Sequence, residues 1–255
     1  MRQLRELPIE VRPLLDLLVP AINEALGDRI ISIVLWGSVV LGDYRPGRSD
    51  LDLIVGLDQD PDAPTLALLQ PVHDQIEAAL PAWRNRVEVA YVGVASLRRF
   101  RTRAHVIARI SPGEPLNLRS ADGAWRIDWF QARRNGVALY GAEPRKIMPE
   151  VSVDELRGEA ARQLGGLSAE LPPDASEGHL AYVALRACRA MHAIECGHQA
   201  TKPGAARWFA ARHPQWAKLI ERVVRVYDAD HTTSDAIGRK EIERLLSWSR
   251  TTVES

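Results

Sequence analysis

The chain has 255 residues, enough for two domains that each bury a hydrophobic core. Its 33 basic and 33 acidic side chains cancel, so its composition shows no general attraction to nucleic acid or to a membrane surface. No uncharged apolar run approaches the roughly 18 residues of a membrane span, and the charged first residues do not resemble a secretory signal. Cys188 and Cys196 alone make neither a disulfide framework nor a zinc site, and we expect a cytoplasmic protein.

The first hundred residues alternate between helical and strand patterns. Apolar spacing, β-branched runs and strict alternation predict these elements in chain order: a helix at 9–26, strands at 30–36 and 51–55, a helix at 64–80 and a strand at 86–92. Residues 100–123 are rich in turn residues and predict a loop or a hairpin. This half of the chain therefore has an α/β pattern.

The second half of the chain is helical in pattern throughout. Helical spacing recurs at 152–171, 177–197, 204–212, 214–228 and 234–249, and glycines and prolines separate these segments. The pattern predicts a C-terminal helical bundle. The change of texture near residues 148–150 places the domain boundary there, giving domains 1–149 and 150–255.

A pair of aspartates follows a glycine-rich turn within residues 37–53, GSVVLGDYRPGRSDLDL. Side chains alternate along a strand, so Asp50 and Asp52 point to the same side while Leu51 and Leu53 point into the core. Two parallel carboxylates repel each other unless a cation lies between them. Mg²⁺ is the obvious candidate, because it prefers hard oxygen ligands and shares them with substrate phosphates.

Gly37 and Ser38 stand where the preceding strand ends and a helix is expected to begin. Glycine lets backbone amides approach an anion closely, and a helix N-terminus adds partial positive charge, so this corner suits phosphate oxygens. Without these neighbours, an Asp-x-Asp pair is more often a turn-forming or strand-edge feature than a metal site. The glycine-serine turn that precedes them favours a functional interpretation.

A third acid, Glu88, lies in the middle of the strand at 86–92. Val87 and Val89 flank it, so its side chain faces away from theirs. If this strand is the neighbour of the one that carries Asp50 and Asp52, the three acids converge. Glu88 could then complete the metal site or take the proton of an attacking hydroxyl.

This combination resembles the nucleotidyltransferase superfamily of the DNA polymerase β type over roughly residues 30–92. The family pattern is Gly-Ser, a spacer, Asp-x-Asp and a later third carboxylate. The resemblance implies that Asp50, Asp52 and Glu88 hold two Mg²⁺ ions while an acceptor hydroxyl attacks the α-phosphorus of a nucleoside triphosphate and expels pyrophosphate. It also implies that phosphate oxygens contact Gly37, Ser38 and Ser49.

The rest of the chain resembles the streptomycin and spectinomycin adenylyltransferases, because VALYG at 137–141 precedes an all-helical half. In that family an arginine, and a lysine thirteen residues later, contact the triphosphate, and the match implies these roles for Arg189 and Lys202. On their own, these two residues are equally typical of solvated surface charges. Arg186, on the same helix face as Arg189, is either a further triphosphate contact or a solubilising residue.

The chain departs from that family where the acceptor should bind. His179 stands where the family has an aspartate, with Asp174 and Glu177 nearby, and the loop at 111–117 lacks the family's aromatic residue. An aminoglycoside is a polycation and needs carboxylates. Glu114 could supply one or could simply be solvated, so the roles of His179 and of residues 110–120 stay open.

From these patterns we expect an α+β fold, with an N-terminal nucleotidyltransferase domain, built on a mixed sheet flanked by helices, and a C-terminal helical bundle. We expect a monomeric, Mg²⁺-dependent enzyme that moves AMP from ATP to a hydroxyl of a small molecule. The aminoglycoside resemblance implies antibiotic resistance. One alternative is transfer to a protein or RNA acceptor, although the neutral charge disfavours RNA. The other is a non-catalytic nucleotide sensor, which would not need Glu88.

Overall fold

The computed structural model describes residues 7–121, 125–228 and 237–254. Contacts within the chain divide it into two compact units, Met1–Glu150 (unit 1) and Val151–Ser255 (unit 2). Unit 1 combines a sheet with helices and unit 2 is helical, so the predicted α+β class is confirmed. That residues 1–149 and 150–255 fold as independent domains stays a prediction.

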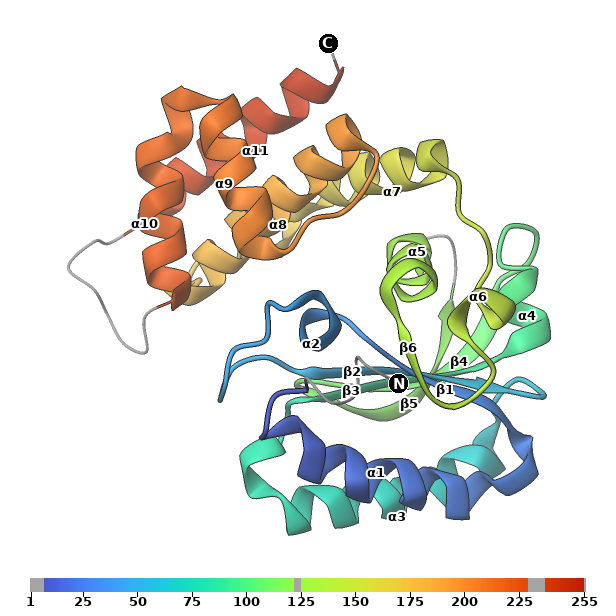
Figure 1. Ribbon diagram of the computed structural model, residues 1–255. Coiled ribbons are helices and arrows are strands. Elements are labelled where there is room, and N and C mark those ends of the chain that lie inside the picture. Colours follow the sequence, from blue (N-terminus) through green and yellow to red (C-terminus); the bar gives the residue numbers. More distant parts are fainter. Residues whose placement is uncertain (1–6, 122–124, 229–236, 255) are drawn as a thin grey trace. The chain divides into compact units, whose positions relative to one another are not determined.

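A six-stranded mixed sheet forms the centre of unit 1 (Figure 1). Its strands are β1 (Ile30–Trp36), β2 (Leu51–Leu57), β3 (Val87–Gly93), β4 (His105–Ser111), β5 (Glu114–Ala121) and β6 (Val137–Gly141). They lie in the order β5-β4-β3-β2-β1-β6. Only β2 and β3 are parallel to each other, and all other neighbours are antiparallel. Asp52 and Glu88 therefore lie on adjacent central strands, β2 and β3.

Helices cover both faces of this sheet. The helices of unit 1 are α1 (Val11–Leu26), α2 (Ser38–Leu41), α3 (Ala63–Ala79), α4 (Val94–Arg98), α5 (Arg126–Asn135) and α6 (Pro144–Ile147), with short 3₁₀ turns at Gly27–Arg29 and Pro81–Trp83. α1 and α3 lie on one face and α5 on the other (Figure 1). The core between α1, α3 and the sheet takes alternate residues of β2 and β3, including Leu53 and Tyr91. The residues between them, Asp52 and Glu88, consequently belong to the other face.

In unit 1 the hairpin, one of the two forms predicted for residues 100–123, is confirmed, and α5 is found where the sequence predicts no helix. Residues 100–123 contain the hairpin of β4 and β5, which turns at Gly113 with φ of 78°; residues 122 and 123 of the predicted turn lie outside the described part. α5 is absent from the prediction because its arginines obscure a narrow apolar stripe. That stripe is nevertheless buried, with Trp129 and Ala132 completely inaccessible to solvent.

Unit 2 is a bundle of helices around α8, which confirms the predicted helical half. Its helices are α7 (Val153–Gly166), α8 (Glu177–Cys196), α9 (Lys202–Arg212), α10 (Ala217–Asp228) and α11 (Arg239–Glu254), with 3₁₀ turns at Leu167–Glu170 and Pro214–Trp216. The helix predicted at 152–171 ends earlier, at Gly166, where two glycines adjoin. Residues 234–236 of the last predicted helix lie outside the described residues. No helix in the described part of the chain is long and apolar enough to span a membrane.

Candidate active site

Asp52 and Glu88 are direct neighbours in the parallel pair of β2 and β3. Neighbouring strands lie about 4.8 Å apart, so the backbones bring the two carboxyl groups to the same place on one face. Both residues are half-buried, whereas Leu51 and Leu53 are buried in the core on the opposite face. The predicted burial of Leu51 and Leu53 is thus confirmed, and the strand of Glu88 is the neighbour of β2, which the sequence stated only as a condition.

Asp50 comes directly before β2, at the end of a turn that is tied to β3. Arg86 donates a hydrogen bond from Nη2 to the carbonyl oxygen of Ser49 at 2.7 Å, and the amide of Leu51 donates to the carbonyl of Arg86 at 2.8 Å. The hydroxyl of Ser49 accepts a hydrogen bond from the amide of Arg45 at 2.9 Å. A hydroxyl that accepts one bond still has a proton to donate, so the turn leaves Ser49 capable of contacting a phosphate oxygen.

Gly37 is shaped around the Asp52 carboxylate. Its φ is 73°, in the region that favours glycine, and a Cβ added there would lie 1.9 Å from Oδ2 of Asp52. The pairing of Trp36 with Asp52 across β1 and β2 creates this close approach. Ser38 follows at once as the first residue of α2. The structure shows that Gly37 makes room for the Asp52 carboxylate, and the predicted approach of a phosphate to Gly37 stays a prediction.

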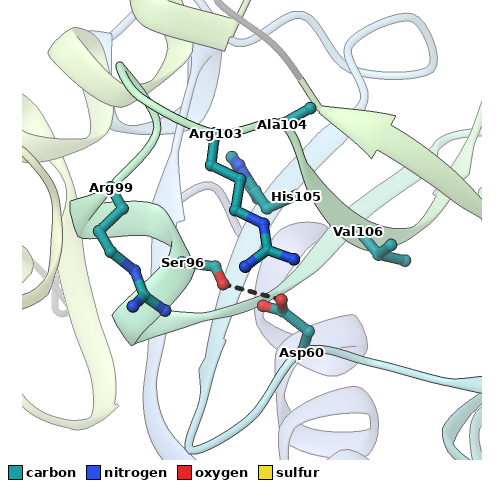
Figure 2. Close-up of a pocket in the computed structure, with 7 residues that line it drawn as sticks. All are labelled: Asp60, Ser96, Arg99, Arg103, Ala104, His105 and Val106. Atoms are coloured by element: carbon teal, nitrogen blue, oxygen red, sulfur yellow. Dashed lines mark hydrogen bonds between the residues drawn. The ribbon is translucent and has the colours of Figure 1, made fainter.

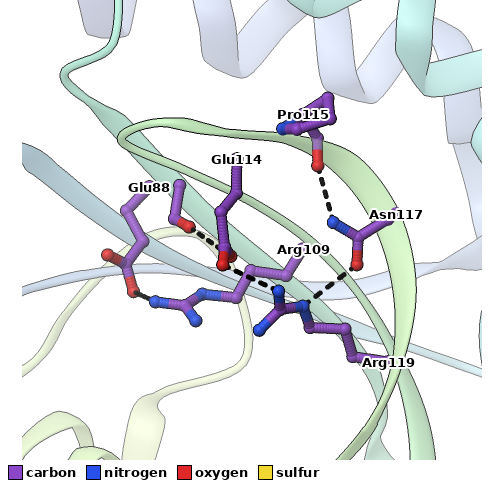
Figure 3. Close-up of polar contacts among 7 residues, drawn as sticks. Glu88, Arg109, Glu114, Pro115, Asn117 and Arg119 are labelled. Atoms are coloured by element: carbon purple, nitrogen blue, oxygen red, sulfur yellow. Dashed lines mark hydrogen bonds and ion pairs between the residues drawn. The ribbon is translucent and has the colours of Figure 1, made fainter. Parts of the chain in front are cut away.

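Glu88 is ion-paired to Arg109, a residue of β4 that the sequence analysis missed. The Nη2 atom of Arg109 lies 2.8 Å from Oε1 of Glu88, and the two side chains are 23% and 22% exposed (Figure 3). The Arg109 guanidinium carbon also lies 5.0 Å from the ring centroid of Trp125. The strand pattern of residues 105–111 was the sequence signal that could have placed Arg109 beside Glu88. The turn residues on both sides of this segment obscured that pattern.

The three predicted metal ligands are not gathered into one cluster. Among the described residues, no group of three or more His, Cys, Asp or Glu side chains is arranged to hold a metal ion. Asp52 and Glu88 are adjacent through their backbones, but the Glu88 carboxylate is engaged by Arg109. The metal site formed by Asp50, Asp52 and Glu88 therefore stays a prediction.

Glu114 lies in a compensated polar network at the tip of the β4–β5 hairpin. Its Oε1 atom is 2.8 Å from Nη2 of Arg119, and the hydroxyl of Ser111 donates to its Oε2 at 3.1 Å (Figure 3). Arg119 also donates from Nε to the Oδ1 atom of Asn117 at 3.1 Å. An arginine thus already neutralises the carboxylate that the sequence offered for a cationic acceptor.

In unit 2, Lys202 lies between two tyrosines. It is the first residue of α9, and its Nζ donates a hydrogen bond to the hydroxyl of Tyr227 at 3.1 Å. The same Nζ lies 5.2 Å from the ring centroid of Tyr182 and 5.3 Å from that of Tyr227. Such stacking keeps an ammonium group positioned while leaving it charged. Tyr227 has no motif around it that would have identified it from the sequence.

The other α8 residues singled out from the sequence have local partners in unit 2. Arg186 forms an ion pair with Glu170, and its guanidinium lies 5.7 Å from the Tyr182 ring centroid. The Nε2 atom of His179 lies 2.7 Å from the carbonyl oxygen of Glu170, at the distance of a hydrogen bond. Arg189 is half-buried one turn after Arg186. His179 thus ties the start of α8 to the preceding turn, which is a structural use.

Comparison with known proteins agrees with this geometry. Residues 17–110 match the nucleotidyltransferase domain family. The whole fold is similar to the crystal structure of spectinomycin adenyltransferase AAD(9) from Enterococcus faecialis with ATP and spectinomycin, with a TM-score of 0.77 and 14% sequence identity. The alignment covers 96% of this chain and 99% of that one. No curated protein sequence matches the chain.

Proposed function

We propose that the protein transfers AMP from ATP to a hydroxyl of a small molecule and releases pyrophosphate, on the premise that residues 17–110 match the nucleotidyltransferase domain family. One observation carries the proposal: Asp52 and Glu88 are adjacent on one sheet face, and Gly37 is shaped to admit the Asp52 carboxylate. Two carboxylates side by side are favourable only with positive charge beside them, and a bound metal ion supplies such charge in catalysis.

The donor set fits magnesium. Asp50, Asp52 and Glu88 offer only carboxylate oxygens, the hard ligands that Mg²⁺ prefers, and in the proposal they hold two ions. Bound there, Mg²⁺ supplies positive charge that stabilises the α-phosphate as the acceptor oxygen attacks. In the structure Arg109 is paired with Glu88, so metal binding through Glu88 requires that the ion replace this arginine.

The remaining roles concern the chain's own groups. Glu88 accepts the proton of the attacking hydroxyl or ligates metal. The pairing of β3 with β2 fixes the backbone of Glu88 opposite that of Asp52. Phosphate oxygens are proposed to contact Gly37, Ser38 and Ser49, with Arg189 and Lys202 as the cationic contacts that unit 2 contributes to the triphosphate. The support for Lys202 is its stacking between Tyr182 and Tyr227, which holds its ammonium group in one position.

We propose an aminoglycoside-type antibiotic as the acceptor. The support is the similarity of fold to a protein whose structure contains spectinomycin. Glu114 is already neutralised by Arg119, and Glu170 by Arg186. Asp174 and Glu177, just before and at the start of α8, carry no ion pair with any described residue, so they are the carboxylates in this region best suited to a cationic acceptor.

The test is transfer from labelled ATP to a panel of acceptors in the presence of Mg²⁺. The purified chain is incubated with spectinomycin, streptomycin and uncharged hydroxyl compounds, and the products are identified by mass. We expect an adenylylated aminoglycoside with wild type and none with Glu88→Gln, while Glu77→Gln, at a half-buried α3 residue, serves as the matched control. Adenylylation of the uncharged compounds alone would replace the aminoglycoside proposal, and no transfer to any acceptor would contradict the enzymatic one.

A further inference from the structure

A polar pocket lies at the far ends of β2 and β3 from the carboxylates. It encloses about 180 Å³, and its polar lining residues are Asp60, Ser96, Arg99, Arg103 and His105 (Figure 2). We call it the arginine pocket. Since Asp52 is five residues before the end of β2, the pocket is roughly 17 Å from the carboxylates along the strand direction. It is thus separate from the proposed active site.

The arginine pocket lies beside a basic segment, residues 98–105, whose four arginines divide into two pairs. Arg98 donates from Nη2 to the carbonyl oxygen of Lys146 at 3.0 Å, and Arg101 donates to the carbonyl oxygen of Glu150. These two arginines fasten the segment to the end of unit 1. In contrast, the Arg99 and Arg103 side chains form no hydrogen bond or ion pair with any described residue, although both line the pocket.

The backbone brings Arg99 and Arg103 together. The amides of Thr102 and Arg103 donate to the carbonyl oxygen of Arg99 at 3.0 and 3.3 Å, which folds the segment into a tight turn. Arg99 and Arg103 are both exposed, and Asp60 offsets only one of their two charges, so the lining of the pocket keeps a net positive charge that attracts an anion. A planar guanidinium matches the oxygens of phosphate in particular, since it donates two parallel hydrogen bonds.

His105 contributes a second and independent signal. It is only 6% exposed, and neither Nδ1 nor Nε2 has a hydrogen-bond partner among the described residues. Burial lowers the pKa of its imidazole, against opposing effects of the Asp60 carboxylate and of a backbone contact with Arg103 that falls short of a well-formed hydrogen bond. A neutral imidazole carries one N–H donor, and a buried donor without a partner is costly. An acceptor oxygen in the pocket would satisfy it.

Asp60 is the acidic residue of the pocket lining, and Ser96 and Gly93 fix the position of its carboxylate. Ser96 donates from Oγ to Oδ2 of Asp60 at 2.7 Å. A Cβ at Gly93 would lie 2.3 Å from Oδ1 of Asp60, so glycine is required for this approach. The Asp60 carboxylate opposes a fully ionised ligand but accepts a hydrogen bond from a ligand hydroxyl. This selects a phosphate that retains a proton or an ester that carries hydroxyl groups.

We propose that the arginine pocket is an anion site that binds a phosphoryl group through Arg99, Arg103 and His105. The shared chemistry is a tetrahedral phosphoryl group, whether inorganic phosphate or a phosphate ester. The site goes beyond AMP transfer and does not depend on it, because neither metal nor ATP takes part in the binding.

Nuclear magnetic resonance of the histidine ring signals tests this directly. Inorganic phosphate is titrated into the full chain at constant ionic strength without Mg²⁺, and His105→Gln identifies the His105 signals. We expect a saturable shift at His105 and none at His73, which is buried against Tyr91. A parallel titration with glycerol phosphate compares a phosphate ester with inorganic phosphate. The compound that binds more tightly identifies which of the two the site prefers, and tighter binding of either supports the site.

Charge-matched variants separate the pocket from general electrostatics. Arg99→Gln with Arg103→Gln should weaken phosphate binding by about tenfold or more, because each removes charge-assisted hydrogen bonds. Arg12→Gln with Arg84→Gln removes the same charge from two exposed arginines outside the pocket and should leave binding unchanged. An absent shift at His105, or equal weakening in both double variants, would overturn the proposal. Neither outcome depends on whether the chain transfers AMP.

Discussion

The two ends of β2 and β3 differ in both chemistry and construction. At one end the pairing of β2 with β3 fixes the positions of Asp52 and Glu88, and Gly37 leaves the space that the Asp52 carboxylate occupies. At the other end Arg99 and Arg103 project from a turn after α4, in contact with no charged partner among the described residues. The paired strands thus suit the catalytic role proposed for the carboxylates, whereas the turn suits the ligand binding proposed for the arginines.

The largest expected effect is at the carboxylate end. Asp52→Asn keeps the shape of the side chain and removes its charge, and we expect turnover to fall by about a thousandfold, since the charge is proposed to hold the Mg²⁺ that stabilises the α-phosphate. The matched control is Asp58→Asn, which follows the other end of β2 and lies 3.8 Å from Arg29 in an exposed pair. Steady-state pyrophosphate release measures both. Similar losses in the two variants would remove the distinction between the ends.

Away from both ends, His73 of α3, packed against Tyr91 of β3, makes the stability of the fold depend on pH. Nε2 of His73 and the hydroxyl of Tyr91 share a hydrogen bond at 2.8 Å, and burial lowers the pKa of His73 from 6.5 to about 4. The unfolded chain therefore binds this proton first, and stability falls as pH drops from 6.5 to 4. The loss is about 3 kcal/mol at pH 4.

The measurement is urea unfolding at pH 7 and at pH 4 for wild type and His73→Gln. The glutamine keeps a hydrogen-bonding group for Tyr91 but does not titrate. All other histidines are common to both proteins, so the difference between the two pH dependences isolates His73. An identical dependence in the variant would refute this assignment.

A smaller effect is expected from Gly37→Ala. The added Cβ overlaps the Asp52 carboxylate and takes an unfavourable φ, so we expect unfolding to become easier by about 2 kcal/mol and turnover to fall with it. Gly42→Ala has a φ of 72° but nothing within 4 Å of its Cβ, which isolates the backbone cost. Thermal unfolding of both compares them. Equal destabilisation would show that contact with Asp52 contributes nothing.

The smallest effect concerns a cation outside the sheet. Lys202→Gln removes the charge between Tyr182 and Tyr227, and we expect KM for ATP to rise about fivefold with little change in kcat. Lys218→Gln removes an exposed charge from α10 and is the control. An unchanged KM for ATP in Lys202→Gln would show that Lys202 does not contact the triphosphate and would remove it from the proposed site.

The sequence predicted the carboxylate end better than the arginine pocket, for a physical reason. Strand alternation fixes the side on which Leu53 and Asp52 lie, so the adjacency of Asp52 and Glu88 could be inferred once the strands were neighbours. Arg109 and Arg103 lie in a segment that turn residues mark as irregular. Their positions depend on a hairpin register and a tight turn, which are tertiary features without a sequence period.

Gly37 and Glu114 show a second limit. The sequence identified Gly37 as permissive, but only the pairing of β1 with β2 reveals that the neighbour it accommodates is Asp52. Likewise Glu114 offered a charge, and only the structure brings Arg119 within 2.8 Å to neutralise it. A residue's type indicates what it can do, while its partners across the sheet decide whether that capacity is already used.

The fate of labelled ATP tests the central claim most directly. Two samples of ATP, labelled at the α- or at the γ-phosphate, are turned over by wild type and by Asp52→Asn with the acceptor that the panel identifies. We predict that wild type moves the α-label to the acceptor and releases the γ-label as pyrophosphate, and that Asp52→Asn does neither. Transfer of the γ-label to the acceptor, or unchanged transfer of the α-label by Asp52→Asn, would contradict AMP transfer at the carboxylate end.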